Sequence, residues 1–273
     1  MTAFASSRPF AQRLDRPAAP QTAQEIPLGM MQLGPAGLSE QWVLRAGGDR
    51  HWTLIAQAMG QERAVFHDAQ GREIYAAFCA TALTLTPHAP TLLGQRALLT
   101  SALFEAGPCQ LGSTHQLTLN GQILAELVMI STFVGHDDSR SNHRITRRQP
   151  RAMPPLPAPP PALAFLALEA RRQARQTRDM KANGDADLRL TPCPSLDFNA
   201  VGLLYFPSFS ALAERAEWIA TGETTPLLQR DMFYFGNLEA GESVDLCRRG
   251  ENISLRRTDG RMIACGRVLR GRL

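Results

Sequence analysis

Apolar positions along the chain follow two spacings, and each spacing predicts a type of element. Over 39–59, and again over about 207–220, apolar side chains recur at mixed steps of three and four, which predicts amphipathic helices. Elsewhere, runs of β-forming residues are separated by turn pairs such as Asn120-Gly121, which predicts antiparallel hairpins. The expected strands are 64–68, 73–85, 96–105, 113–119 and 124–134, then 228–235, 243–248, 253–258 and 262–269.

A proline-rich segment divides the chain. Residues 150–161 include seven prolines in twelve positions, a composition that predicts an extended, semi-rigid spacer. A helix-prone segment rich in Ala, Leu and Arg follows over 162–181. The chain start shows no hydrophobic period. The expected organisation is therefore a flexible tail (1–24), a first unit (25–149), a spacer with a basic linker helix (150–186) and a second unit (187–273).

The two units share one order of elements. Each opens with an apolar strand, continues with one long helix and ends with strands only. This order predicts an α+β protein of two tandem hotdog folds, a double hotdog, in which each antiparallel sheet wraps round a central helix. The helix residues expected to face the sheets are Leu38, Trp42, Leu44, Trp52 and Ile55 in the first unit, and Leu204, Phe209, Leu212 and Ile219 in the second.

Composition narrows the class of protein. With 273 residues, 44% hydrophobic and 20% charged, the chain has enough apolar side chains for a core, which excludes disorder as its dominant state. No apolar run is long enough to span a membrane, and the N-terminus lacks the pattern of a signal peptide. We therefore expect a cytoplasmic protein with no membrane partner.

Basic residues are concentrated in one segment. Residues 144–181 carry nine basic and two acidic side chains, in a chain whose net charge is only +4. Such a segment favours an anionic partner, namely nucleic acid, the phosphates of coenzyme A (CoA) or an acidic carrier protein; a solvated linker explains it equally well. Nucleic acid is disfavoured because Phe165 is the segment's one aromatic residue for stacking. The arginines expected to receive the partner are Arg171, Arg172, Arg175 and Arg178.

Several common chemistries leave no signature in this sequence. The five cysteines are widely spaced, which argues against a disulfide framework or a zinc site. The six histidines all lie in the first unit, and no two have the helical spacing of metal ligands. Glycine-rich nucleotide-binding motifs and the serine-hydrolase elbow are missing too. We expect neither a metal nor a bound cofactor.

The strongest local signal precedes the second helix. In Asp197-Phe-Asn199-Ala-Val-Gly202-Leu203, polar residues and a glycine lead into a helix start, where outward-pointing N–H groups suit a thioester oxyanion. The segment resembles the D-x-N-x-x-G-H pattern of the 4-hydroxybenzoyl-CoA thioesterase hotdog family. Leu203 stands where that pattern has His, which argues against the usual thioesterase chemistry. Capping of the helix by Asp197 and Asn199 is the alternative interpretation.

A wider resemblance points to one group of hotdog proteins. The segments 37–42, 48–52, 71–78, 197–206 and 235–237 resemble the double-hotdog family of the leinamycin-pathway acyltransferase/decarboxylase. The resemblance implies that methylmalonyl-CoA is decarboxylated and that the propionyl group passes to an acyl carrier protein, with a tyrosine carrying it. The chain has three tyrosines, and Tyr75 lies in the matching stretch of the first unit, so the resemblance assigns the acyl group to Tyr75.

The chemistry of such a reaction defines what the site must offer. Loss of CO2 from a malonyl thioester forms an enolate, so the site needs donors to the thioester oxygen and a poorly solvated place for the carboxylate. The expected oxyanion contacts are backbone N–H groups near Gly202 and the side chain of Asn199. The polar run 135–144 adds Ser139, Asn142 and His143 as candidate donors; an ordinary polar loop is the alternative.

The sequence thus predicts an enzyme of polyketide or related secondary metabolism. It would decarboxylate a malonyl- or methylmalonyl-type CoA thioester and transfer the acyl group to a carrier protein, with the CoA thioester as substrate. A hotdog thioesterase or dehydratase, and a catalytically inactive hotdog that binds a carrier protein, are the alternatives. The sequence leaves the oligomeric state open.

Overall fold

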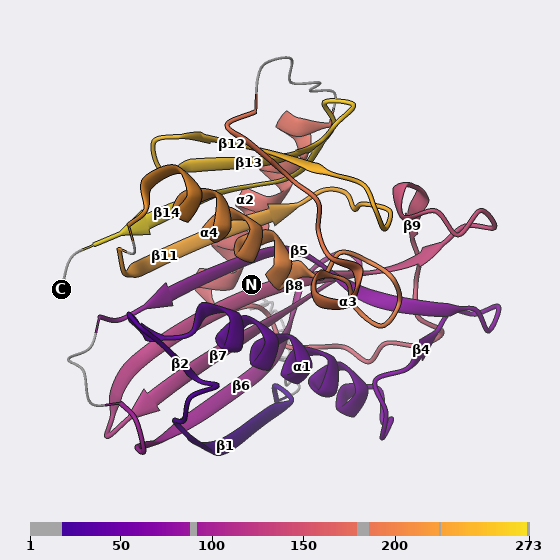
Figure 1. The fold of residues 1–273 in the computed structure, drawn as a ribbon. Helices are drawn as coiled ribbons and strands as arrows, with labels where there is room; N and C mark the ends of the chain where they lie inside the picture. Colours follow the sequence, from indigo (N-terminus) through magenta and orange to yellow (C-terminus); the bar gives the residue numbers. More distant parts are fainter. Residues whose placement is uncertain (1–17, 88–91, 179–185, 224, 272–273) are drawn as a thin grey trace, which may run out of the picture.

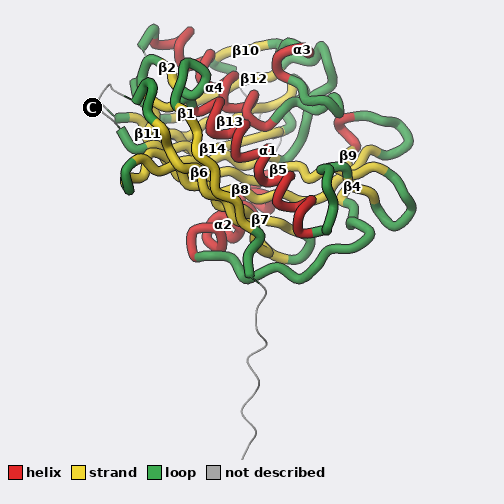
Figure 2. Tube along the Cα trace, turned by 90° about the horizontal axis from the view of Figure 1, so that it is seen from below, coloured by secondary structure: helices red, strands yellow, loops and turns green. Residues whose placement is uncertain are grey.

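The computed structural model describes residues 18–87, 92–178, 186–223 and 225–271. These residues form one antiparallel sheet of twelve strands, with helices α1 and α4 on one face and α2 on the other (Figures 1 and 2). The main strand order is β1-β6-β7-β8-β5-β11-β14-β13-β12-β10. The main path of the sheet therefore consists of five strands from each half of the chain, joined edge to edge, and two short strands pair beside it with β5 and β8.

The first half places α1 across its five strands. These elements are β1 (Gln21–Pro27), α1 (Glu40–Ala58), β5 (Glu73–Leu85), β6 (Arg96–Gly107), β7 (Gln110–Leu119) and β8 (Gln122–His136). The helix begins where it does because the Oγ of Ser39 accepts a hydrogen bond from the N–H of Trp42 at 3.3 Å. Asn120 and Gly121 both have positive φ, as a two-residue hairpin between β7 and β8 requires.

The second half repeats this arrangement with shorter strands. It contains β10 (Leu188–Leu190), α4 (Phe206–Thr221), β11 (Leu227–Tyr234), β12 (Val244–Arg249), β13 (Asn252–Arg257) and β14 (Met262–Arg270). The α4 helix ends at Gly222, whose φ of 64° is the left-handed conformation that glycine adopts readily. Leu204, Phe209 and Leu212 are buried against this smaller sheet.

The two halves meet along β5 and β11. Ala80–Thr84 pairs antiparallel with Gln229–Phe233, and this pairing makes the sheet continuous. A bulge between Phe78 and Ala80 interrupts β5 just before the pairing starts. The N-terminal part of β5 therefore lies outside the pairing of β5 with β11, which we call the seam, and no strand of the second half pairs with it.

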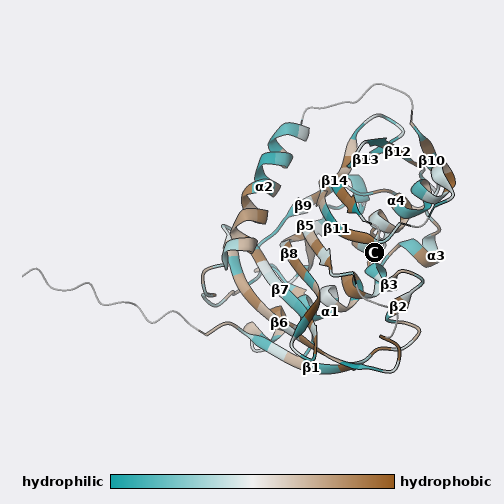
Figure 3. Cartoon of the chain, turned by 90° about the vertical axis from the view of Figure 1, so that its left-hand side faces the viewer, coloured by the Kyte–Doolittle hydropathy of each residue, from teal (hydrophilic) through white to brown (hydrophobic). Residues whose placement is uncertain are grey.

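The linker helix α2 (Pro161–Thr177) lies on the outer face of the sheet, against β8 and β5. It buries Leu163, Leu166, Ala167 and Ala170 there, so one side of this helix is part of the core. Close approach requires Gly112 on β7, because a Cβ at that position would lie 2.5 Å from a methyl group of Leu163. Hydropathy changes along the helix, from apolar near its start to polar near its end (Figure 3).

Two histidines form a buried polar chain beneath α1. His51 contacts the hydroxyls of Ser113 and Ser131 at 2.7 Å each, and His115 contacts Ser113 at 2.7 Å and Ser101 at 2.8 Å. Burial lowers the pKa of each imidazole to about 3. Both rings are therefore neutral at physiological pH, and they link α1 to three strands.

A buried ion cluster joins the halves near the start of α1. The guanidinium of Arg230, only 2% exposed, lies 2.8 Å from the carboxylate of Glu40, and it also contacts Glu214. Arg270 pairs with the same Glu214. Burial raises the pKa of Glu40, and Arg230 opposes this shift. Removing Glu40 would leave the buried guanidinium of Arg230 with one carboxylate partner fewer, so this pair is the part of the cluster most sensitive to substitution.

The structure corrects two details of the sequence interpretation and leaves a third untested. Strand β1 begins at Gln21, inside the expected tail 1–24, because its backbone pairs with β6. Ile219 does not face the sheet but is 60% exposed, since this end of α4 extends beyond the short strands. The linker helix is described only to Arg178, so its expected end near 181 lies outside the described residues.

Several short elements were not expected from the sequence. They are β2 (Leu33–Gly34), β3 (Gly37–Leu38), the 3-10 helix η1 (Asn142–Arg144), β9 (Ile145–Arg147) and α3 (Pro194–Asp197); β4 (Phe66–His67) is shorter than the strand expected there. Within the described residues, no helix is long and apolar enough to cross a membrane.

Candidate functional site

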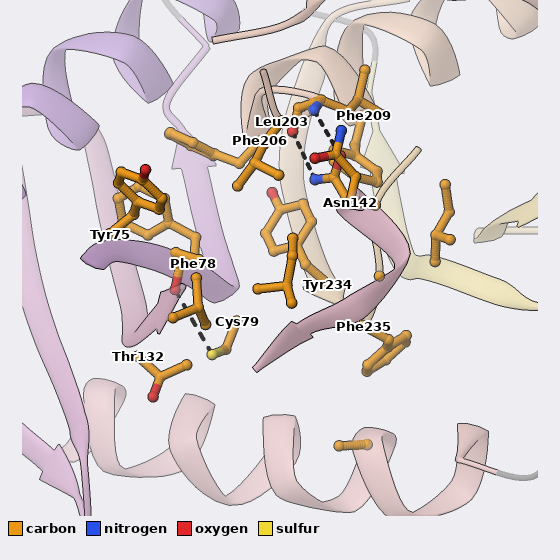
Figure 4. Close-up of a pocket in the computed structure, with 18 of the residues that line it drawn as sticks. Tyr75, Phe78, Cys79, Thr132, Asn142, Leu203, Phe206, Phe209, Tyr234 and Phe235 are labelled. Atoms are coloured by element: carbon orange, nitrogen blue, oxygen red, sulfur yellow. Dashed lines mark hydrogen bonds between the residues drawn. The ribbon is translucent and has the colours of Figure 1, made fainter. Parts of the chain in front are cut away.

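A cavity of about 550 Å³ opens where the seam between β5 and β11 ends. Its walls come from the N-terminal part of β5, the loop that precedes α4, the turn between β13 and β14, and the outer helix α2. Both halves and the linker thus contribute to one cavity, which the bulged part of β5 also lines (Figure 4).

Aromatic side chains form the inner wall of the cavity. The rings of Phe78 and Phe206 are 4.3 Å apart, and Tyr234 packs edge-on against Phe209 at 5.3 Å. Phe206 can approach α1 because Gly48 has no side chain; a Cβ there would lie 2.9 Å from the Phe206 ring. The interior is therefore apolar and suits an acyl chain or a weakly solvated group.

The loop before α4 does not provide the backbone donors that the sequence predicted. The N–H of Gly202 donates to the carbonyl oxygen of Asn199 at 3.0 Å, and the N–H of Leu203 donates to Asn199 Oδ1, also at 3.0 Å. The N–H groups of Leu204 and Tyr205 are bonded to Asn237 Oδ1 and to the carbonyl oxygen of Asp197. The expectation of free N–H groups near Gly202 is wrong because the loop uses them for its own folding.

Asn199 itself lines the cavity. Its Oδ1 accepts from Val201 at 3.2 Å and from Leu203, which fixes the orientation of the amide. No described residue accepts a hydrogen bond from its Nδ2 group. The Nδ2 group of Asn199 is therefore available to donate a hydrogen bond to a ligand in the cavity.

Asp197 has a structural role. Its carboxylate is buried, accepts the N–H of Cys193 at 2.8 Å and lies 3.7 Å from Arg215. It does not line the cavity, and it does not cap α4, whose first turn has no side-chain cap. The carboxylate instead holds the short helix α3, and its backbone oxygen holds Tyr205.

The polar run after β8 divides into three different environments. Asn142 is buried at the cavity wall, and its Nδ2 donates to the carbonyl oxygens of Gly202 at 2.7 Å and Leu238 at 2.8 Å, so it positions the loop before α4. His143 lines the cavity, and its Nε2 contacts Glu242 at 2.7 Å. Ser139 is exposed, bonds to Asp137 and does not line the cavity.

All three tyrosines of the chain line the cavity. Burial raises the pKa of Tyr75, with Glu73 adding to the effect, and burial raises the pKa of Tyr205 to about 12. Burial also raises the pKa of Tyr234, whose hydroxyl lies 3.0 Å from Thr81. The phenols are therefore protonated at neutral pH.

Arginines surround the mouth of the cavity. The lining includes Arg147 from β9, Arg171 and Arg178 from α2, Arg257 from β13 and Arg261 from the turn that follows. Only Arg257 of these pairs with a carboxylate among the described residues, namely Asp259. No Asp or Glu belongs to the described lining. The mouth therefore attracts an anion.

The predicted arginine set of α2 is divided by the structure. Arg171 and Arg178 are two turns apart on one side of the helix and line the cavity. Arg172 and Arg175 are exposed and do not line it, and Arg172 pairs with Glu169 at 2.8 Å. Only two of the four can therefore touch a ligand inside the cavity.

Sequence reasoning missed several lining residues. Arg147, Arg257, Arg261 and Asn237 come from separate segments, and no local motif connects them. Asn237 lies in the segment 235–237 that carried part of the resemblance, which was the one available signal for it.

Comparison with solved structures identifies the fold. The chain is similar to an acyl-ACP thioesterase from Bacteroides thetaiotaomicron, with 9% identity, a TM-score of 0.60 and coverage of 91% of this chain and 97% of that one. It is similar to the 12:0-ACP thioesterase from Umbellularia californica, with 13% identity, a TM-score of 0.59 and coverage of 91% and 92%. HtdX of Mycobacterium tuberculosis has 10% identity, a TM-score of 0.53 and coverage of 91% and 98%.

At these identities the similarity establishes the fold alone. The chain is an α+β double hotdog, as its order of elements predicted. The sequence matches no protein-family model and no curated protein.

Proposed function

We propose that this protein acts on an acyl thioester carried by CoA or by a carrier protein, that it decarboxylates a malonyl-type acyl group, and that it transfers the product to a carrier protein. Both acyl-ACP thioesterases named above share the fold, which supports the thioester class. The observation that carries the proposal is the cavity itself, which has five arginines at its mouth, an aromatic interior and no carboxylate in its described lining.

This lining fits decarboxylation for a chemical reason. Hydrolysis needs a base that activates water, whereas decarboxylation needs none, because the electrons of the breaking C–C bond pass to the thioester carbonyl as CO2 leaves. The site must then stabilise an enolate oxygen, and Asn199 Nδ2 is placed to do so. A protonated phenol such as Tyr205 supplies a proton to the α-carbon, since its pKa of about 12 keeps it neutral until then.

Acyl transfer has two routes in this site. In the first route a carrier thiol attacks the carbonyl carbon directly, and CoA leaves with the proton of that thiol. In the second route the Tyr75 oxygen attacks first and CoA leaves with the phenol proton; the carrier thiol then attacks the Tyr75 ester and gives its proton back to the phenolate. The raised pKa of Tyr75 means that the second route needs a base at the moment of attack. In the second route, Tyr75→Phe abolishes transfer, and the wild type incubated with malonyl-CoA shows a mass increment on the Tyr75 peptide.

The test of decarboxylation is Asn199→Ala. Loss of one preorganised donor should lower kcat for CO2 release by about 10²–10³, measured with methylmalonyl-CoA and malonyl-CoA. Asn252→Ala is the matched control, because Asn252 is exposed on β13. Unchanged CO2 release in Asn199→Ala would remove Asn199 from the site, and a wild type that releases no CO2 would refute decarboxylation itself.

Hydrolysis is the second candidate, and one contact favours it. Glu242 accepts from Nε2 of His143, so this nitrogen carries the proton and Nδ1 is left as an acceptor, the arrangement of an oriented general base. The assay separates the two: a thioesterase releases CoA and the intact acid with no CO2, and loses activity in His143→Gln. Hydration or dehydration of the acyl chain would indicate a dehydratase. No turnover together with carrier-protein binding would indicate an inactive scaffold.

A further inference from the structure

We propose that the outward side of α2 is the docking surface for the carrier protein, separate from the arginines that line the cavity. This proposal rests on the proposed function, because it names the partner of the same site. The surface consists of Phe165, Leu168, Arg172 and Arg175.

Helix geometry places these four side chains together. They are spaced at i, i+3, i+7 and i+10, so they lie on one side of α2. The opposite side holds the buried Leu163, Leu166 and Ala170 against the sheet. The four side chains of the docking surface, called the stripe below, therefore face away from the protein along the length of the helix.

The stripe combines two exposed apolar side chains with positive charge. Phe165 is 71% exposed and Leu168 is 58% exposed, although neighbouring apolar positions of the helix are buried. Arg175 has no ion-pair partner within the described part of the chain, and Arg172 shares Glu169 with Gln173. Exposed apolar groups next to arginines are typical of protein interfaces, and they favour a partner that presents carboxylates beside apolar side chains.

The position of the stripe beside the cavity favours a carrier protein over other acidic partners. Arg171 and Arg178 lie on the flank of the same helix, between the stripe and the cavity mouth. A protein docked on the stripe thus stands beside the mouth, where a flexible phosphorylated arm attached to it can enter. Two roles follow: Arg171 and Arg178 bind the phosphate that CoA and a carrier-protein arm have in common, whereas the stripe binds only the carrier protein.

Binding of holo acyl carrier protein tests this assignment without turnover. Fluorescence anisotropy of labelled holo carrier protein should give a Kd at least tenfold weaker for Arg172→Glu/Arg175→Glu than for the wild type. Raising the salt concentration should weaken wild-type binding and shrink this difference, since exposed charges are screened. Phe165→Ala/Leu168→Ala should weaken binding by a factor that salt does not remove.

The matched control is Arg63→Glu/Arg96→Glu. It makes the same change in net charge at exposed sites away from α2. Arg171→Glu serves as the second comparison, and it should raise the KM for CoA thioesters, which the stripe variants should leave unchanged. The docking surface is refuted if the control weakens carrier binding as much as the stripe variant does, or if neither stripe variant weakens it.

The outcomes also distinguish this proposal from the proposed function. If carrier binding depends on the stripe but no turnover is seen, the docking surface is supported and the enzymatic function is refuted. If CoA thioesters are turned over but carrier binding does not depend on the stripe, the enzymatic function is supported and the docking surface is refuted.

Discussion

Acidification should destabilise this protein through its two buried histidines. The pKa of His51 and of His115 falls from 6.5 to about 3 on folding, because burial penalises the charged ring. The unfolded chain therefore binds more protons than the native protein between these values, and stability is lost as the pH falls below 6.5. Each histidine contributes about 1.4 kcal/mol between roughly pH 7.5 and 5.5, so the pair contributes about 2.7 kcal/mol.

A comparison of variants isolates this contribution. Urea unfolding followed by tryptophan fluorescence gives the free energy of unfolding at both pH values for the wild type and for His51→Gln/His115→Gln. The wild type should lose about 2.7 kcal/mol more than the double variant. Groups with raised pKa, such as Glu40, act in both proteins and cancel in the difference.

A control variant and a second measurement test the neutral state of the two buried rings. His67 is exposed, so His67→Gln should leave the pH dependence of the wild type unchanged. Nitrogen-15 spectra of labelled histidine should show the His51 and His115 rings neutral at about pH 5, each as a single tautomer. Protonated rings at that pH, or equal pH dependence in the wild type and the double variant, would show that the rings are solvated or charged.

Two further predictions concern close packing and the loop before α4. Gly112→Ala should destabilise the protein by about 1–3 kcal/mol and displace α2, because the new Cβ meets Leu163. Gly34→Ala is the control, since a Cβ there meets open space, and it should leave the stability unchanged. Urea unfolding measures the stability, and limited proteolysis detects the displacement of α2. Asn142→Ala should cost about 2 kcal/mol and raise the KM for CoA thioesters, since the carbonyls of Gly202 and Leu238 lose their donor; an unchanged KM would show that the loop is held without it.

The regular elements could be predicted from the sequence because their signals are local. The strand expected at 73–85 is β5, and the helix expected from 39 to 59 is α1 with Ser39 as its cap. The bulge at Phe78 has no such signal, since alternation alone does not show where a neighbouring strand begins to pair. The sequence therefore could not predict at which residue of β5 the cavity begins.

The site could be predicted only in part, because its hydrogen bonds join distant positions. Of the predicted set, Tyr75, Asn142, His143, Asn199 and two of the four arginines do line the cavity. The N–H groups near Gly202 are used by side chains that the pattern does not reveal: the nearby Asn199, and Asn237 more than thirty residues away. Asn142 is a positioning residue that the sequence does not reveal, since both carbonyl oxygens that accept from its Nδ2 lie in the other half.

The repeated topology places one helix position of each half in a different environment. Phe206 and Glu40 are each the first residue of the central helix of their half. Phe206 lines the cavity, whereas Glu40 is buried against Arg230. A pair of identical subunits would have to use one residue for both purposes. Because a single chain encodes each half separately, one copy of the position lines the cavity and the other holds the two halves together through Arg230. Calorimetric titration should therefore show one ligand per chain.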